Sequence, residues 1–238
     1  MNPQTLGPLY PSKHLLREIR VRYHHAFTQT GFVRSAVYSI LVFLSSVVVS
    51  FIAIGYATER ASNSVTDIIL SNVPALDVDA FFVWGSMLLV LSITVLLLLD
   101  PKRIPFTLNS IGVFYIIRSG FTVLTHLGPF PTQTDNAYNV GVIFGRFLNG
   151  NDFFFSGHTG LPFLIALIFW RYAGVRYTFL VWSVFMATVV LLGHLHYSID
   201  VAGAYFITYT IFSICEWLFP NDRKVFFSER AIERTHVA

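Results

Sequence analysis

The chain has 238 residues, of which 54% are hydrophobic and only 12% are charged, so it has too few polar side chains to cover a soluble protein of this size. The formal charge of +3 is too small to indicate nucleic-acid binding, and the one cysteine, Cys215, rules out an intrachain disulfide framework. We therefore expect an integral membrane protein that binds no nucleic acid.

Six apolar runs predict an all-α, polytopic membrane protein with about six transmembrane helices, because a helix needs about 20 apolar residues to cross the hydrocarbon core. A basic amphipathic segment, Ser12–His25, precedes the first run and lacks the pattern of a signal peptide, so we expect it to lie along the membrane surface. Pro105 suits the first turn of the third helix. The fourth run is short, and its helix should begin near Ser156. The runs are Ser35–Tyr56, Ala80–Leu99, Ile104–Leu127, Thr159–Tyr172, Tyr177–Gly193 and Val201–Phe219.

The lysine and arginine residues predict the orientation. The N-terminal segment, the second and fourth loops and the C-terminal tail are rich in them, whereas the opposite loops carry only Arg60 and Arg146. The positive-inside rule makes the rich side cytoplasmic. We therefore expect a cytoplasmic basic segment, 1–33, a six-helix membrane catalytic domain, 34–219, and a cytoplasmic tail, 220–238. Polar residues between spans three and four, and between spans five and six, then face the exoplasm or an organelle lumen.

Arg118 interrupts the third apolar run. An arginine inside a span usually points into the helix bundle, and its planar fork matches phosphate oxygens. A salt bridge to an acidic partner such as Asp200 or Asp152 is the structural alternative. The residues on the same predicted helical stripe are Thr122, Thr125 and Pro129.

The first polar segment, residues 155–159, reads Phe-Ser-Gly-His-Thr. Ser156 is suited to cap a helix, Gly157 lets the backbone approach a ligand closely, and the next two residues fall in the first turn. The exposed N–H groups of a helix N-terminus bind anions, and His158 beside a bound phosphate could protonate a departing alkoxide. Taken alone, this pattern is more often a helix cap with an interfacial histidine.

The second polar segment, residues 196–200, reads His-Tyr-Ser-Ile-Asp. His196 and Asp200 are four residues apart and share one face if the segment is helical. The carboxylate could then fix the tautomer of the imidazole and leave its other nitrogen free as a nucleophile or base. The alternative is an interfacial pair that only caps the sixth helix.

Both segments resemble motifs of the sphingomyelin synthases. Residues 152–159 fit that family's pattern of an aspartate, three residues and then Ser-Gly-His-Thr, and residues 196–201 resemble its other long motif, with Ser198 in place of a threonine. The sphingomyelin synthases belong to the wider type 2 phosphatidic acid phosphatase (PAP2) superfamily. The resemblance implies a six-helix membrane fold with its active site on the exoplasmic face.

The resemblance also implies catalytic roles. His196 would attack phosphorus to give a phosphohistidine, Asp200 would orient it, and His158 would protonate the leaving lipid alcohol. A lipid alcohol or water would then resolve the intermediate, with no metal or other cofactor. The expected substrate-binding residues are Arg118, Ser156, Gly157, Thr159, Asp152 and Tyr197.

Departures from the family patterns leave the substrate open. Asn109 and Ser110 stand where the synthases have paired arginines, and Val190 stands where the superfamily's lipid phosphatases have an arginine. The expected partners are the bilayer, a phospholipid donor and an acceptor, which is ceramide, diacylglycerol or water. The donor head-group, the acceptor, the membrane and the presence of a homo-oligomer stay undecided.

Three alternatives remain. A lipid phosphate phosphatase would use the same residues with water as acceptor. A metal-dependent membrane hydrolase would use His158, His194, His196 and Asp200 as ligands, although His194 and His196 would face different sides of a helix. A non-catalytic lipid-binding protein would retain the fold and turn over no phospholipid.

Overall fold

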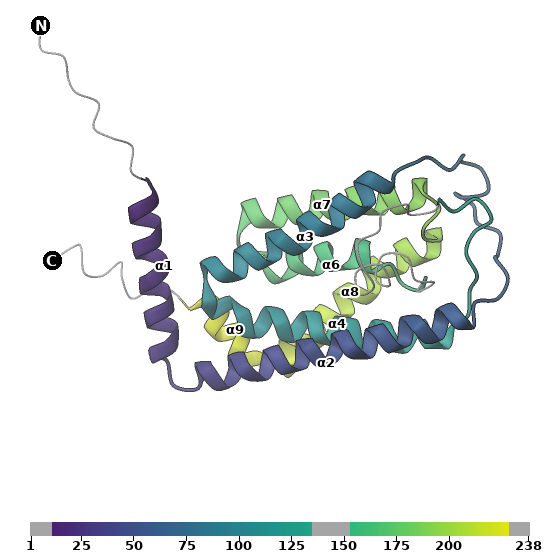
Figure 1. The fold of residues 1–238 in the computed structure, drawn as a ribbon. Helices are drawn as coiled ribbons and strands as arrows, with labels where there is room; N and C mark the ends of the chain where they lie inside the picture. The colour runs from purple at the N-terminus through teal and green to yellow at the C-terminus, as the bar shows by residue number, and fades with distance from the viewer. Residues whose placement is uncertain (1–10, 135–152, 229–238) are drawn as a thin grey trace, which may run out of the picture.

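The computed structural model describes residues 11–134 and 153–228, and its regular structure there is helical throughout, which confirms the predicted all-α fold (Figure 1). The helices are α1 (Pro11–Thr28), α2 (Phe32–Glu59), α3 (Asp79–Leu99), the 3-10 turn η1 (Pro101–Arg103), α4 (Ile104–Leu124), α6 (Gly157–Ile168), α7 (Ala173–Leu192), α8 (Ser198–Leu218) and α9 (Pro220–Phe227). Pro105 lies in the first turn of α4, as predicted.

Five helical segments of the described chain are long and apolar enough to cross a membrane: α2, α3, η1 with α4, α7 and α8. They indicate an integral membrane protein. The fourth predicted span differs, because α6 has 12 residues and is about 18 Å long, whereas the hydrocarbon core is about 30 Å thick. The helix ends at Ile168, whose carbonyl accepts a hydrogen bond from Arg223, and the chain then turns toward α7.

Helix α6 lies inside the bundle, where it contacts α4, α7 and α8 (Figure 1). Its apolar residues face neighbouring helices on all sides, and Leu164, Ile165, Ala166 and Ile168 are completely buried. A helix that is hydrophobic around its whole circumference needs such a surrounding. Because protein covers it, α6 does not have to match the thickness of the bilayer.

Helices α2 and α4 run side by side along the bundle (Figure 1). The face of α2 toward α4 carries small residues, and Ser39, Ser46 and Ser50 are buried there. The hydroxyl groups of Ser50 and Ser119 are 2.9 Å apart and share a hydrogen bond across the contact. Small residues and interhelical hydrogen bonds are the usual basis of helix association in membranes, where apolar burial alone gives no preference.

The first, third and fifth loops meet at one end of the bundle. The Ser62 N–H donates to the His126 carbonyl and the Leu76 N–H donates to the Leu192 carbonyl, both at 2.8 Å. Helices α6 and α8 begin at this end, whereas α1 and α9 contact the bundle at the other end, next to η1 (Figure 1). Both polar segments are therefore placed under the same group of loops.

The close approach of α2 and α4 gives a testable expectation for Gly112. A Cβ atom at this position would lie 2.8 Å from a methyl carbon of Val42, with the Val42 backbone at 3.4 Å behind it. Gly112→Ala should therefore force the helices apart and lower the free energy of unfolding by about 1–3 kcal/mol, as overpacking does. Gly120→Ala, on the same helix with nothing within 4 Å of its Cβ, is the control and should leave the melting temperature in detergent unchanged or raised. Equal melting temperatures for the two variants would contradict this packing.

Candidate active site

The first polar segment forms the start of α6, as predicted. Ser156 is the N-cap residue, and its hydroxyl oxygen accepts a hydrogen bond from the Thr159 N–H at 3.4 Å. Gly157 begins the helix and His158 follows in the first turn. The imidazole of His158 is thus held at a helix N-terminus, where the partial positive charge of the peptide dipoles favours an anion.

The second polar segment is built differently from the prediction. Helix α7 ends at Leu192, His194 has a positive φ of 54°, and α8 begins only at Ser198. His196 therefore precedes the helix, so the condition for a shared helical face with Asp200, that the whole segment is helical, is not met. The two side chains still meet, because the Oδ2 atom of Asp200 caps the Tyr197 N–H at 2.9 Å and lies 3.4 Å from the Nδ1 atom of His196.

The protonation of His196 follows from its neighbours. Its Nδ1 atom is 3.0 Å from the carbonyl oxygen of Phe153, which is closer than the Asp200 carboxylate. A carbonyl oxygen can only accept, so Nδ1 carries the proton and donates it to Phe153. In the neutral ring, the lone pair then lies on Nε2. The main-chain carbonyl fixes the tautomer, and the carboxylate supplies a negative charge beside the ring.

The two histidines of the polar segments are neighbours. The ring centroids of His158 and His196 are 6.2 Å apart. The ring of His158 also packs against Phe82 of α3, with centroids 4.5 Å apart, and its Nδ1 atom is buried without a hydrogen-bond partner among the described residues. Two imidazoles at this separation can contact opposite sides of one phosphoryl group.

Arg118 joins this group from α4. It is buried, and its Nε–H donates to the Phe155 carbonyl at 2.8 Å. Its guanidinium passes so close to Gly157 that a Cβ atom there would lie 3.0 Å from Nε. The helical stripe predicted to continue from Arg118 is shorter than expected. Helix α4 ends at Leu124, and Thr125 and Pro129 lie beyond it with exposed side chains. Because Gly157 has no side chain, the Arg118 guanidinium can lie against the start of α6.

A main-chain hydrogen bond links the two polar segments directly. The Ser156 N–H donates to the carbonyl of Asp200 at 3.1 Å. The starts of α6 and α8 are therefore in contact, with Arg118 against the first of them. The structure brings together His158, His196, Asp200, Ser156, Gly157 and Arg118.

The remaining predicted substrate-binding residues have other surroundings. The Tyr197 hydroxyl donates to the Gly128 carbonyl at 2.8 Å and accepts from the Val65 N–H at 3.4 Å, so it connects the first and third loops. The Oγ1 atom of Thr159 is buried without a partner among the described residues. Asp152 lies outside the described residues. The roles of all three in binding substrate stay predictions.

His194 points away from the other two histidines of the candidate metal site. Its Nδ1 atom is 2.6 Å from the Thr132 hydroxyl and its Nε2 atom is 3.1 Å from the Val73 carbonyl, so both nitrogens bind loop residues. Within residues 11–134 and 153–228, no three His, Cys, Asp or Glu side chains are grouped to hold a metal ion. The geometry supports a loop-anchoring role for His194.

Sequence reasoning missed Asp67, which holds the start of α8. Its Oδ2 atom accepts hydrogen bonds from the N–H and the hydroxyl of Ser198, at 2.8 and 2.7 Å, and its Oδ1 atom accepts from the N–H groups of Ile69 and Leu70. The first loop is thereby fixed two residues from His196. Spacing along the chain gave no signal for this contact, because 131 residues separate its partners.

A comparison with known protein families matches the part of the chain that carries both polar segments. A family model described as PAP2 superfamily C-terminal matches residues 149–218, a range that contains both polar segments and all of α8. No curated protein matches the chain. The family match supports membership of the PAP2 superfamily and an enzyme that acts on phosphate esters.

The contacts of Asp67 predict a pH-dependent stability. Burial raises the pKa of its carboxyl, but the hydrogen bonds from Ser198, Leu70 and Ile69 outweigh burial and hold the pKa below its ordinary value of 3.8. The carboxylate therefore stabilises the fold above about pH 3.8 and loses this effect as the pH falls through the lowered pKa. Asp67→Asn should lower the free energy of unfolding by about 2 kcal/mol at neutral pH, because the NH2 group that replaces one carboxylate oxygen cannot accept a hydrogen bond, so the side chain can no longer accept from Ser198 and from Ile69 and Leu70 at the same time.

Thermal unfolding in detergent from pH 7 down to pH 3 measures this difference. The melting temperatures of wild type and Asp67→Asn should stay apart above about pH 3.8 and begin to approach one another below it, as the carboxylate takes up its proton. The exposed carboxylate of Asp77 in the same loop provides the matched control, Asp77→Asn, which should melt close to wild type at every pH. A gap between wild type and Asp67→Asn that stays constant down to pH 3 would refute the role given to the charge.

Proposed function

We propose that this chain is a membrane lipid phosphotransferase of the sphingomyelin synthase type, which takes a phospho-head-group from a phospholipid and passes it to a lipid alcohol, ceramide or diacylglycerol, or to water. The observation that carries the proposal is the 6.2 Å separation of the His158 and His196 rings beside a buried arginine. The PAP2 family match to this part of the chain supports phosphate-ester chemistry.

In the first step, the lone pair on His196 Nε2 attacks phosphorus. A P–N bond forms, the bond between phosphorus and the lipid oxygen breaks, and the head-group phosphate stays on the ring. The ring then carries a positive charge, which the Asp200 carboxylate, 3.4 Å from Nδ1, stabilises. The negative charge of the bound phosphate favours the protonated form of His158, which gives its proton to the departing alkoxide, so that a neutral lipid alcohol leaves.

In the second step, the neutral His158 accepts a proton from the incoming alcohol or water. The new oxygen attacks phosphorus, the P–N bond breaks, and the electron pair returns to Nε2 of His196. Each histidine is then in its original protonation state, so the cycle consumes no further reagent. Arg118 and the N–H groups at the start of α6 would hold the phosphate oxygens during both steps.

The setting favours a lipid over a soluble substrate. The polar groups lie at one end of a helix bundle whose outer faces are apolar, and the side chain of Ile199, next to Asp200, is 60% exposed. A lipid can bring its head-group to the histidines while its chains stay in the hydrocarbon. By the positive-inside rule, we assign this end to the exoplasmic or lumenal side, with both termini cytoplasmic.

Water as the acceptor would pass through the same intermediate and make the chain a lipid phosphate phosphatase. The acceptor is decided by which molecule reaches the phosphohistidine. The transferase is our preferred form because both polar segments match sphingomyelin synthase motifs, whereas Val190 replaces the arginine of the phosphatases.

The direct test is to incubate the purified protein with labelled phosphatidylcholine, phosphatidylethanolamine or phosphatidic acid, with and without ceramide, and to identify the products by mass. Head-group transfer to ceramide supports the transferase, and release of phosphate or a phospho-head-group into water supports the hydrolase. Lack of turnover with every donor would refute both. Loss of activity with a chelator, and recovery with a stoichiometric metal, would replace this scheme by a metal-dependent one.

Variants of the three catalytic residues test the assigned chemistry. His196→Ala should abolish turnover, and His158→Ala should lower kcat about 100- to 10,000-fold because the leaving alkoxide receives no proton. Asp200→Asn keeps an oxygen for the Tyr197 N–H but removes the charge, so it should lose activity while remaining folded. His126→Ala, which removes an exposed histidine near the same end of the bundle, is the control and should keep full activity. Full activity in His196→Ala would disprove the assigned nucleophile.

A further inference from the structure

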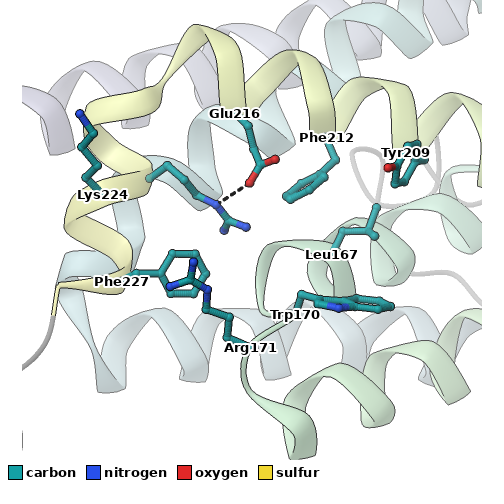
Figure 2. A pocket seen from close by; sticks show the side chains of 9 residues that line it. Leu167, Trp170, Arg171, Tyr209, Phe212, Glu216, Lys224 and Phe227 are labelled. Atoms are coloured by element: carbon teal, nitrogen blue, oxygen red, sulfur yellow. Dashed lines mark hydrogen bonds and ion pairs between the residues drawn. The ribbon is translucent and has the colours of Figure 1, made fainter.

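A pocket of about 720 Å³ lies at the end of the bundle away from the histidines (Figure 2). Its walls come from the end of α6, from the second half of α8, from α9 and from the segment that joins α6 to α7. The pocket is a consequence of the short α6. Helices α6 and α8 begin in contact, but α6 has 12 residues and α8 has 21. Helix α6 is therefore nine residues, or about 14 Å, shorter than α8.

The pocket carries an excess of positive charge. Its charged lining residues are Arg171, Arg223, Lys224 and Glu216. Arg223 donates to the Glu216 carboxylate at 2.9 Å and to the Ile168 carbonyl at 2.8 Å, so it pairs with the carboxylate that lines the pocket. The charges of Arg171 and Lys224 are then not balanced by the lining, which favours an anionic ligand.

Arg171 is held in a position suited to bind such a ligand. Its guanidinium carbon lies 4.2 Å from the centroid of the Phe227 ring, which is a cation–π contact. This contact holds the guanidinium at the pocket wall, and the planar fork of its N–H groups matches two oxygens of a phosphate. Figure 2 shows the Arg171 guanidinium against the Phe227 ring, while the side chain of Lys224, on the same short helix as Phe227, points away from Arg171.

The other part of the pocket is apolar. Leu167 and Phe212 are buried in its wall, and Tyr209 lies beside them (Figure 2). Tyr209 precedes Glu216 by seven residues on α8, so it lies about 10 Å further toward the middle of the bundle. The pocket is therefore cationic toward the end of the bundle and apolar toward the hydrocarbon, in the order of a phospholipid's head-group and chains.

Aromatic residues place this pocket at the membrane boundary. Trp170 in its wall is 48% exposed, and Trp217 near the end of α8 is 79% exposed. Tryptophan side chains are enriched at the level of the lipid head-groups. A ligand in this pocket would therefore lie at the level of the lipid head-groups.

We propose that this pocket binds an anionic phospholipid of the leaflet opposite the histidines, with the head-group phosphate on Arg171, the positive charge of Lys224 adding to the attraction, and an acyl chain along Leu167 and Tyr209. This site goes beyond the proposed function, because the lipid bound here is not a substrate and no bond in it is broken. The rich positive charge of this end makes the leaflet the cytoplasmic one.

Photo-crosslinking tests the proposal by position. The whole protein is reconstituted in phosphatidylcholine vesicles that contain phosphatidic acid with a diazirine in one acyl chain, and the labelled peptides are mapped by mass spectrometry. We expect label on the peptides of 167–171 and 209–227. Label near residues 155–159 and 196–200 would report substrate binding separately, so this test does not depend on the proposed function. No label on the pocket peptides would overturn the proposal.

Two double variants that each remove two positive charges, one in the pocket and one outside it, test whether the label depends on a site. Arg171→Gln with Lys224→Gln should reduce the pocket label about ten-fold or more, since one lost charge-assisted contact already corresponds to that factor. Arg17→Gln with Arg20→Gln, two exposed cations of α1 at the same end of the bundle, should leave it unchanged. Equal reduction in both double variants would show only general attraction to anionic lipid and would refute a site.

Competition on the wild-type protein separates a lipid from a soluble phosphate and does not depend on how the variants fold. Excess unlabelled phosphatidic acid should remove the pocket label, whereas sn-glycerol 3-phosphate, which offers the same phosphate without chains, should not. Displacement by sn-glycerol 3-phosphate at equal concentration would contradict a lipid site and assign the pocket to a soluble anion.

Discussion

The hydrogen bond from the Ser156 N–H to the Asp200 carbonyl joins the starts of two helices that are far apart in sequence. Backbone groups at helix ends need partners, and within a membrane-embedded bundle water is not available to supply them. Here the ends satisfy one another: Ser156 caps α6, the Asp200 side chain caps α8, and the main-chain bond links the two. The positions of both histidines follow from this junction.

The same contact between the starts of α6 and α8 also determines where α6 ends, at the other end of the bundle. Since α6 starts beside α8 but has only 12 residues against 21, it stops inside the bundle, and Arg223 of α9 reaches its last carbonyl. The space beyond is the cationic pocket. One helix pair thus carries polar chemistry at both ends: the start of α6 holds His158 for the proposed transfer, and its end borders the proposed lipid site.

The sequence predicted the features that depend on local composition. Apolar length predicted five of the six spans, and Ser156 predicted the N-cap, because both are decided within one helix. The sequence failed where distant residues decide the outcome. The pairing of His196 with Asp200 was expected from helical spacing, but it comes from the helix cap, while the tautomer of His196 comes from the Phe153 carbonyl and the fixed start of α8 from Asp67. No local pattern could reveal these contacts.

The central claim is that His196 carries the phosphoryl group between donor and acceptor. The most direct measurement is rapid acid-free quenching of the protein with a phospholipid donor in the absence of acceptor, followed by mapping of phosphorylated peptides. We expect a phosphate or phospho-head-group on the peptide that contains His196, and none in His196→Ala. The group should accumulate in His158→Ala only with a donor whose leaving alcohol needs no proton, such as a nitrophenyl ester. Modification of His158 instead of His196, or turnover with no phosphorylated histidine, would contradict the claim.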